Sequence, residues 1–317
     1  MPVPILILAF QNPEALSARI EEAGLLGLSP IYVSIDGTSG KEFAYEISEN
    51  QRKCVGLATE YKSNNTIHNL KISTENLGQS VAIPRAIDWF FSDVDSGIIL
   101  EEDCRLDTSP DFQEALNLFP KLLDNRDVAA VCLSNLWPPA LLDTQRLSEK
   151  VNFIKTQFFN SWGWYSSEEN WREFRRSGNE ARMLFDAIEK LNLGLLAKLF
   201  LVLEWRNHIK RSRKINKPTW ALRFTMDLIV RSKLVAIPVK NFVVHEPSPN
   251  AVHIKKNPRW AVTEFKTSVR CSFKSLEIQQ LTPILESFTV ANVHGASILR
   301  FLRGKIRRVV LILNIVE

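Results

Sequence analysis

The sequence predicts an α/β fold in which a mostly parallel central sheet is flanked by helices. Short apolar runs rich in β-branched residues alternate with helical patterns along the first hundred residues. The run at 97–100 is apolar throughout, which is typical of a strand buried on both faces. Polar residues gather where the predicted strands end, and ligands bind beyond the carboxyl ends of the strands in such sheets.

The alternation can be followed along the chain. In the first hundred residues we expect strands at 3–10, 30–35, 66–72 and 97–100, and helices at 15–25, 41–62 and 80–91. Beyond them we expect a helix at 109–123, a strand at 128–134, an irregular aromatic segment at 158–164, helices through 176 and over 179–230, and short extended runs at 234–238 and 241–244. The pattern weakens after residue 250. We therefore predict one α/β domain over 1–260 and a helical C-terminal extension over 261–317.

Composition narrows the class of protein. Of 317 residues, 45% are hydrophobic and 24% are charged, which predicts a substantial core and an ordinary soluble protein. The four cysteines are scattered without a C-x-x-C pair, so no disulfide framework or zinc cluster is predicted. The apolar start lacks a basic region and a cleavage site, and no apolar run is long enough to span a membrane. We expect a cytoplasmic protein.

The formal charge of +5 is concentrated in two segments. Residues 206–217 contain six Lys or Arg and no acid; they suit the phosphates of a lipid-linked acceptor, although a solvated loop is the favoured interpretation. Nucleic acid is not an expected partner, because interleaved aromatic residues are lacking. At helical spacing, residues 297–316 place arginines on one side and apolar residues on the other. This pattern suits a helix that lies on the anionic inner face of the cell membrane, and equally a helix packed on its own domain or on a dimer partner.

Three adjacent acids, Glu101, Glu102 and Asp103, follow the buried strand at 97–100. Clustered carboxylates suit a divalent cation, which could bridge the diphosphate of a nucleotide. Alone, such a cluster is more often a solvated loop or a helix N-terminus. Its expected position beside Asp36 and Asn76 favours a cation-binding site over these two alternatives. Asp36 itself can accept hydrogen bonds from a base or ribose, and with Gly37 it also forms a strong turn signal.

Several segments resemble those of a known family. PILILAFQNPE, IYVSIDGTSG, NLGQSVAIPRAIDWFF and GIILEEDC resemble segments of bacterial nucleotide-diphospho-sugar transferases, whose sugar-transferring domain has the GT-A fold. Their order and spacing are similar to those of the N-acetylglucosaminyltransferase I group, in which an acidic motif ends a strand. FFNSWGWYSSEENWREF resembles the WGWA-x-W-x-x-x-W segment of the bacterial proteins. The resemblance covers roughly the first 250 residues.

The resemblance implies a metal-dependent glycosyltransferase that moves a sugar from a nucleotide diphosphate, expected to be UDP, to a glycan or lipid-linked acceptor. It implies that Phe10 and Asp36 lie near the base and that Asn76 and Gly78 shape the nucleotide pocket. Glu101 and Glu102 would approach the ribose or donor sugar, and Asp103 would ligate Mn²⁺ or Mg²⁺. Trp162, Gly163 and Trp164 would form part of the donor and acceptor site. Aromatic stacking on sugars gives the tryptophans an independent rationale, and core packing is the alternative.

The general base departs from the family's pattern. Ala221 occupies the position of the expected acid, so an inverting transfer needs a substitute base. Asp227 on the same predicted helix and Glu102 are the candidates, whereas Glu204 is better explained as a helix-surface charge. The remaining options are a different stereochemical course, or a non-catalytic nucleotide- or glycan-binding partner protein. A nucleotidyltransferase is a weaker alternative, because residues 9–13 are not a glycine-rich phosphate loop.

Two histidines complete the candidates. His253 lies where such folds supply a histidine to the metal or diphosphate, and an exposed loop histidine is an equal interpretation. His245 comes directly after an apolar run and is expected to be structural.

Overall fold

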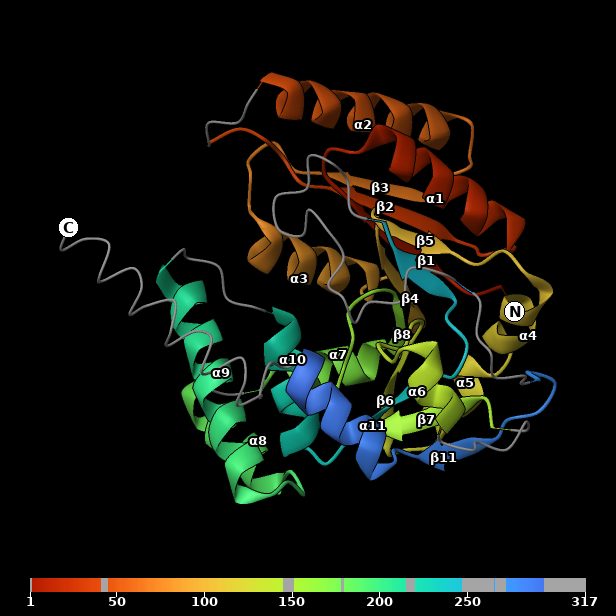
Figure 1. Cartoon of the computed structure of the whole chain (residues 1–317). Helices are drawn as coiled ribbons and strands as arrows, with labels where there is room; N and C mark the ends of the chain where they lie inside the picture. The colour runs from red at the N-terminus through yellow and green to blue at the C-terminus, as the bar shows by residue number, and fades with distance from the viewer. Residues whose placement is uncertain are drawn as a thin grey trace, which may run out of the picture.

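A computed structural model describes residues 2–40, 45–144, 151–177, 180–214, 220–246, 265 and 272–293. A nine-stranded sheet with helices on its faces forms the centre of the molecule (Figure 1). Its strands follow one another in the order β11 (Ile278–Gln280), β7 (Phe153–Thr156), β9 (Leu234–Pro238), β6 (Val128–Cys132), β8 (Trp164–Ser167), β4 (Ser96–Glu101), β1 (Ile5–Ala9), β2 (Ile31–Ile35) and β3 (Asn69–Ile72). The predicted fold class, an α/β protein with a mostly parallel sheet, is confirmed.

Parallel pairing dominates the half of the sheet formed by the first part of the chain. Strands β4, β1, β2 and β3 are neighbours and run in the same direction. Strand β8 is antiparallel to both of its neighbours, β4 and β6. Beyond it, β6 and β9 are parallel, β9 and β7 are antiparallel, and β7 and β11 are parallel. Strand β11 comes from the predicted extension over 261–317 and forms the edge of this same sheet.

The described helices are α1 (Pro13–Leu25), α2 (Tyr45–Ser63), α3 (Gln79–Phe90), α4 (Pro110–Leu116), α5 (Phe119–Asp124), α6 (Pro139–Thr144), α7 (Glu168–Arg175), α8 (Glu180–Lys190), α9 (Leu195–Lys214), α10 (Trp220–Val230), α11 (Pro283–Phe288) and the π-helical turn η1 (Thr289–Val293). None of the helices within the described ranges has both the length and the apolar character needed to cross a membrane.

The alternation of side chains along β1 explains the layers. Ile5 and Ile7 belong to a core shared with α1 and α2, whereas Leu6 and Leu8 belong to a core shared with α3. Figure 1 shows α1 and α2 on one side of these strands and α3 on the other. All five residues of β1 are buried, as expected for a strand covered on both faces.

A second, two-stranded sheet lies directly after the acidic segment. Strand β5 (Cys104–Leu106) pairs antiparallel with β10 (Val243–His245), so that Cys104 is opposite His245. This pairing joins positions that are about 140 residues apart in the sequence. It brings the end of β10 beside the end of β4.

Candidate functional site

The carboxyl ends of four parallel strands form one edge of the sheet. Strands β4, β1, β2 and β3 are paired in register, and their last residues are Glu101, Ala9, Ile35 and Ile72. The polar segments that follow these strands therefore lie along this edge, as the sequence predicts for a parallel sheet. Three clusters of contacts occupy it.

The first cluster forms around Asp36. Its carboxylate accepts hydrogen bonds from the backbone N–H groups of Leu77 and Gly78, at 3.0 and 2.9 Å, and from Nδ2 of Asn76 at 3.2 Å. Gly78 has a φ of 71° and precedes α3, a conformation that glycine adopts readily. Asp36 therefore holds the turn that starts α3. The turn expected from the sequence was the local one at Asp36-Gly37, whereas these contacts reach a turn about 40 residues further along the chain; nucleoside binding by Asp36 stays a prediction.

The second cluster forms around Glu102. Its carboxylate accepts hydrogen bonds from the N–H groups of Phe10, at 3.0 Å, and Gln11, at 3.2 Å. Asn12 then caps α1 by accepting a hydrogen bond from the N–H of Ala15 at 3.1 Å. Burial raises the pKa of Glu102 to about 7, although these N–H groups oppose the rise. Glu102 thus connects the end of β4 to the loop between β1 and α1.

The third cluster joins Asp103, His245 and Trp162. Nε2 of His245 lies 3.1 Å from Oδ2 of Asp103. The imidazole stacks on the ring of Trp162, with ring centroids 4.6 Å apart and an interplanar angle of 7°. His245 is only 4% exposed, whereas the side chain of Asp103 is 29% exposed. A partly exposed carboxylate is therefore supported from inside by a buried, stacked imidazole.

Glu101 differs from its two acidic neighbours because it still belongs to β4, opposite Leu8. Burial raises the pKa of its half-buried carboxyl group, and the nearby Asp103 carboxylate adds to the rise while His245 opposes it. The three adjacent acids thus have three different environments. Glu102 binds backbone, Asp103 binds a histidine, and Glu101 lies at the end of the strand.

The aromatic segment contributes to the site through Trp162 and to the core through Trp164. Trp164 is 1% exposed and packs among Phe159, Trp171 and Phe224. Between the two tryptophans, Gly163 has a φ of 69°, and a Cβ atom there would lie 2.8 Å from Cγ2 of Val243. The left-handed backbone at Gly163 separates the two rings, one toward His245 and one into the core. Whether Trp164 contributes to a sugar site remains a prediction, and its observed contacts are those of core packing.

Asp103 and His245 provide one oxygen and one nitrogen donor for a metal ion. This donor set suits Mn²⁺, whereas Mg²⁺ prefers oxygen ligands alone. Within the described parts of the chain, no group of three or more His, Cys, Asp or Glu side chains could hold a metal ion. Asp103 and His245 would supply two of the ligands of such a cation, and its other ligands would come from outside this pair.

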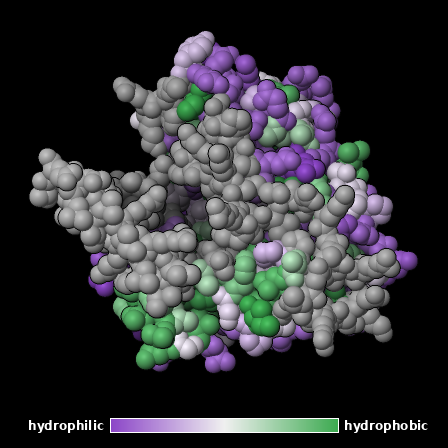
Figure 2. All heavy atoms as spheres, viewed as in Figure 1, coloured by the Kyte–Doolittle hydropathy of each residue, from purple (hydrophilic) through white to green (hydrophobic). Residues whose placement is uncertain are grey.

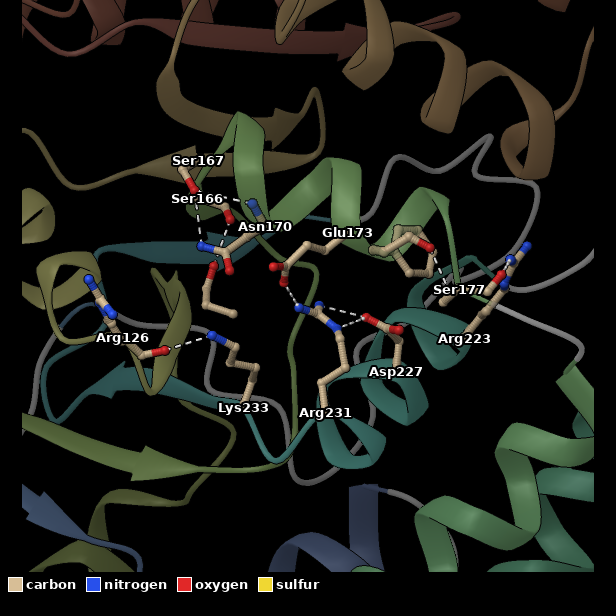
Figure 3. Close-up of polar contacts among 12 residues, drawn as sticks. Arg126, Ser166, Ser167, Asn170, Glu173, Ser177, Arg223, Asp227, Arg231 and Lys233 are labelled. Atoms are coloured by element: carbon tan, nitrogen blue, oxygen red, sulfur yellow. Dashed lines mark hydrogen bonds and ion pairs between the residues drawn. The ribbon is translucent and has the colours of Figure 1, made fainter.

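Neither candidate general base has an unengaged carboxylate. Asp227 lies on α10 and is 2% exposed; its Oδ2 is 2.7 Å from Nε of Arg231, which also forms an ion pair with Glu173 (Figure 3). Burial raises the pKa of Asp227, and Arg231 opposes this rise. Glu102 is bound to backbone N–H groups, as described above. Ala221, on the first turn of α10, packs against the hydrophobic core.

His245 is the residue that sequence reasoning placed outside the site. The sequence did contain a signal for a role in the site: His245 ends an apolar strand, as the three acids do at the end of β4. Its pairing with Asp103 depends on the antiparallel β5–β10 sheet, which no pattern in the neighbouring sequence predicts. His253 and residues 297–316 lie outside the described residues, so the expectations for them stay predictions.

Comparisons with known proteins give only distant likenesses. No protein-family model matches the sequence, and no curated protein matches it. Solved structures that resemble it include three with low scores. A mannosyltransferase from Pyrobaculum calidifontis in complex with GDP-Man and Mn²⁺ has 10% identity and a TM-score of 0.38, covering 73% of this chain and 70% of that one. A mannose-1-phosphate geranyltransferase from Thermus thermophilus has 12% identity and a TM-score of 0.36, covering 75% and 74%.

The third, a cytidylyltransferase from Leptospira borgpetersenii serovar Hardjo-bovis, has 11% identity and a TM-score of 0.34, covering 56% of this chain and 66% of that one. This chain therefore spans slightly less than two thirds of the cytidylyltransferase. With TM-scores this low, none of the three likenesses supports the assignment of a function. That assignment has to come from the residues at the edge of the sheet.

Proposed function

We propose that this protein is a metal-dependent glycosyltransferase of the GT-A type, which transfers a sugar from a nucleotide diphosphate donor to a glycan or lipid-linked acceptor. UDP is the proposed nucleotide and Mn²⁺ the proposed metal. Asp103 and His245 would hold the cation, which would neutralise the diphosphate leaving group when bound. The loops held by Asp36 and Glu102 would line the nucleotide, with Phe10, Asn76 and Gly78 closest to it.

The observation that carries the proposal is the Asp103–His245 contact at the carboxyl edge of the parallel strands. A partly exposed carboxylate and a buried imidazole 3.1 Å apart are placed where parallel sheets bind ligands. Trp162 fixes the plane of the imidazole by stacking, which keeps its nitrogen directed at Asp103. A structural role alone would explain a buried histidine, but it would not explain why its acidic partner remains partly exposed at this edge.

Isothermal titration calorimetry with UDP, in the presence and absence of Mn²⁺, tests the metal site. We expect wild-type protein to bind UDP at least about tenfold more tightly with Mn²⁺, and we expect Asp103→Ala and His245→Ala to lose this metal dependence. Asp95→Ala is the matched control, because this exposed acid lies at the opposite end of β4. Metal-dependent UDP binding that survives Asp103→Ala would sink the assignment of this residue.

A second candidate function is a non-catalytic nucleotide- or glycan-binding protein. It is favoured by Ala221 at the position of the usual acid and by the contacts of Asp227 and Glu102, both of which are engaged in structural interactions. Release of UDP from a panel of UDP-sugars with candidate acceptors separates the two functions. Turnover that Asp103→Ala abolishes supports the transferase, whereas tight UDP binding without turnover for any donor supports the binding protein.

The weaker nucleotidyltransferase alternative has its own assay. Such an enzyme would release pyrophosphate from a nucleoside triphosphate and a sugar phosphate, while a glycosyltransferase would not. A coupled pyrophosphate assay on the same protein preparation therefore distinguishes the two transfer reactions. Pyrophosphate release that depends on Asp103 would mean that the carboxyl edge of the sheet catalyses nucleotidyl transfer and not glycosyl transfer.

A further inference from the structure

Helices α8 and α9 expose a group of large apolar side chains. Leu195, Leu196 and Leu199 on α9 are 84%, 68% and 51% exposed, and Phe185 on the adjacent α8 is 61% exposed. We call these four residues the apolar patch. Figure 2 shows apolar surface at the lower left, where Figure 1 places α8 and α9. An exposed group of this kind marks a surface that contacts something apolar.

The exposed leucines are not the side of α9 that packs on the core of the protein. The helix already buries Leu201, Trp205 and Ile209, which recur every four residues and pack with α8 and α10. At 100° per residue these side chains and the patch leucines occupy separate sectors of the helix surface, with mean directions about 125° apart. Helix α9 therefore has two apolar faces, of which only one is used within the described protein.

Cations continue the exposed face. Arg206 and Lys210 are both exposed, and their positions seven and eleven residues after Leu199 place them on the same side of the helix. Helix α9 contains six Lys or Arg and one acid, a net charge of +5 that equals the charge of the entire chain. The exposed face therefore runs from leucine side chains at its N-terminal end to cations at its C-terminal end.

We propose that the α8–α9 patch docks the protein on an anionic membrane surface, with Leu195, Leu196, Leu199 and Phe185 inserted among the lipid acyl chains and Arg206 and Lys210 against the phosphates. Apolar side chains beside cations on one helix face are what such an interface binds. A second copy of the chain fits less well, because it would bring two strongly cationic helices together. This docking surface is separate from the Asp103 edge and does not depend on the proposed transferase activity.

Vesicle co-sedimentation of the full chain tests the proposal. We expect binding to phosphatidylcholine vesicles that contain phosphatidylglycerol and much weaker binding to phosphatidylcholine alone. Leu195→Ser/Leu199→Ser should lower the partition coefficient at least about tenfold by removing inserted apolar surface. Arg206→Gln/Lys210→Gln should lower it by about tenfold at low salt, and added salt should reduce that difference.

Leu25→Ser is the matched control, because Leu25 is 71% exposed at the end of α1 and lies outside the patch. Unchanged thermal midpoints would show that the variants are folded. Wild-type binding by both double variants would overturn the proposal and place any membrane contact elsewhere, for example in residues 297–316. A wild-type dimer that Leu195→Ser/Leu199→Ser disperses, together with no vesicle binding, would overturn it in favour of self-association.

Discussion

Glu102 links two loops of the candidate site through a single carboxylate. The residue follows β4, and its side chain accepts hydrogen bonds from Phe10 and Gln11 in the loop after β1. The same loop leads to the N-cap of α1 at Asn12. An acid that the sequence offers as a candidate base therefore connects the ends of neighbouring strands.

Replacing Glu102 tests this connection. Glu102→Ala should lower the free energy of unfolding by about 2–3 kcal/mol, because two N–H groups lose their acceptor. Glu102→Gln keeps one carbonyl oxygen and should cost less than half as much. Urea unfolding measures both. Equal midpoints for Glu102→Ala and wild type would show that the Phe10 loop is held by other contacts.

Gly163 offers a second test at the scale of one residue. Gly163→Ala combines a left-handed φ with a Cβ atom 2.8 Å from Val243, and it should cost at least about 2 kcal/mol of stability. The substitution should also disturb the Trp162–His245 stack, which near-ultraviolet circular dichroism reports. Gly56→Ala is the control: nothing lies within 4 Å of the added atom on α2, so it should stabilise by about 0.5–1 kcal/mol. Equal stability of both variants would contradict the close packing around Gly163.

The acids of the site were predictable from the sequence, but their contacts were not. Glu101 to Asp103 follow an apolar strand, and strand ends are where parallel sheets bind ligands. The partner of Asp103 could not be read in the same way, because His245 is 142 residues further along the chain. Local sequence patterns predict which residues end a strand. They do not predict which strand from a distant part of the sequence will lie beside that end.

At the scale of elements, the strands with the clearest patterns were predicted correctly. The apolar runs at 3–10, 30–35, 66–72, 97–100 and 128–134 correspond to β1, β2, β3, β4 and β6. Strands β5, β7, β8 and β11 were not predicted. Each has three or four residues, too few to show a period. Strand β8 also begins at Trp164, within the segment expected to be irregular, and it is the antiparallel strand between β4 and β6.

Arg231, directly after α10, forms ion pairs with Asp227 on α10 and with Glu173 on α7, and the buried Asp227 makes stability depend on pH. Burial raises the pKa of Asp227 in the folded state above its unfolded value, so the folded protein binds this proton more tightly and gains stability as the pH falls through the raised pKa. Arg231→Met removes the strongest of the groups that oppose the rise. At pH 8 we expect a loss of about 3 kcal/mol, because the buried carboxylate loses its ion-pair partner and keeps only its weaker interactions with Ser177 and Arg223.

The loss for Arg231→Met should shrink as the pH falls, because a protonated Asp227 no longer needs a counter-charge. Urea unfolding at a series of pH values from 8 downward measures the trend. Arg172→Met is the matched control: Arg172 is 56% exposed and pairs with Glu168 within α7, so its removal should cost under about 1 kcal/mol at every pH. A loss for Arg231→Met that stays constant with pH would mean that Asp227 does not carry the effect.

At the scale of the whole molecule, the candidate site is assembled from segments that lie far apart in the sequence. Phe10 comes from the loop after β1, Trp162 from the segment before β8, and His245 from β10. The large sheet and the small β5–β10 sheet hold these residues together without a continuous sequence motif. The sequence pattern predicts the parallel half of the large sheet, formed by β4, β1, β2 and β3, but it misses β7, β8 and β11. The small sheet, which places His245 beside Asp103, follows only from the three-dimensional structure.

Because the site joins distant segments, ligand binding should stabilise the whole fold. UDP with Mn²⁺ at about 100 times its dissociation constant stabilises the folded state by about 2.7 kcal/mol. For a chain of this size, that corresponds to a rise in the unfolding midpoint of about 4 °C. Scanning calorimetry should show this rise for wild type and for the control Asp95→Ala, but not for Asp103→Asn or His245→Asn. UDP without metal should give a smaller rise in all four proteins. An equal rise with UDP and Mn²⁺ in Asp103→Asn would show that Asp103 does not hold the cation, and that the metal does not join β4 to β10.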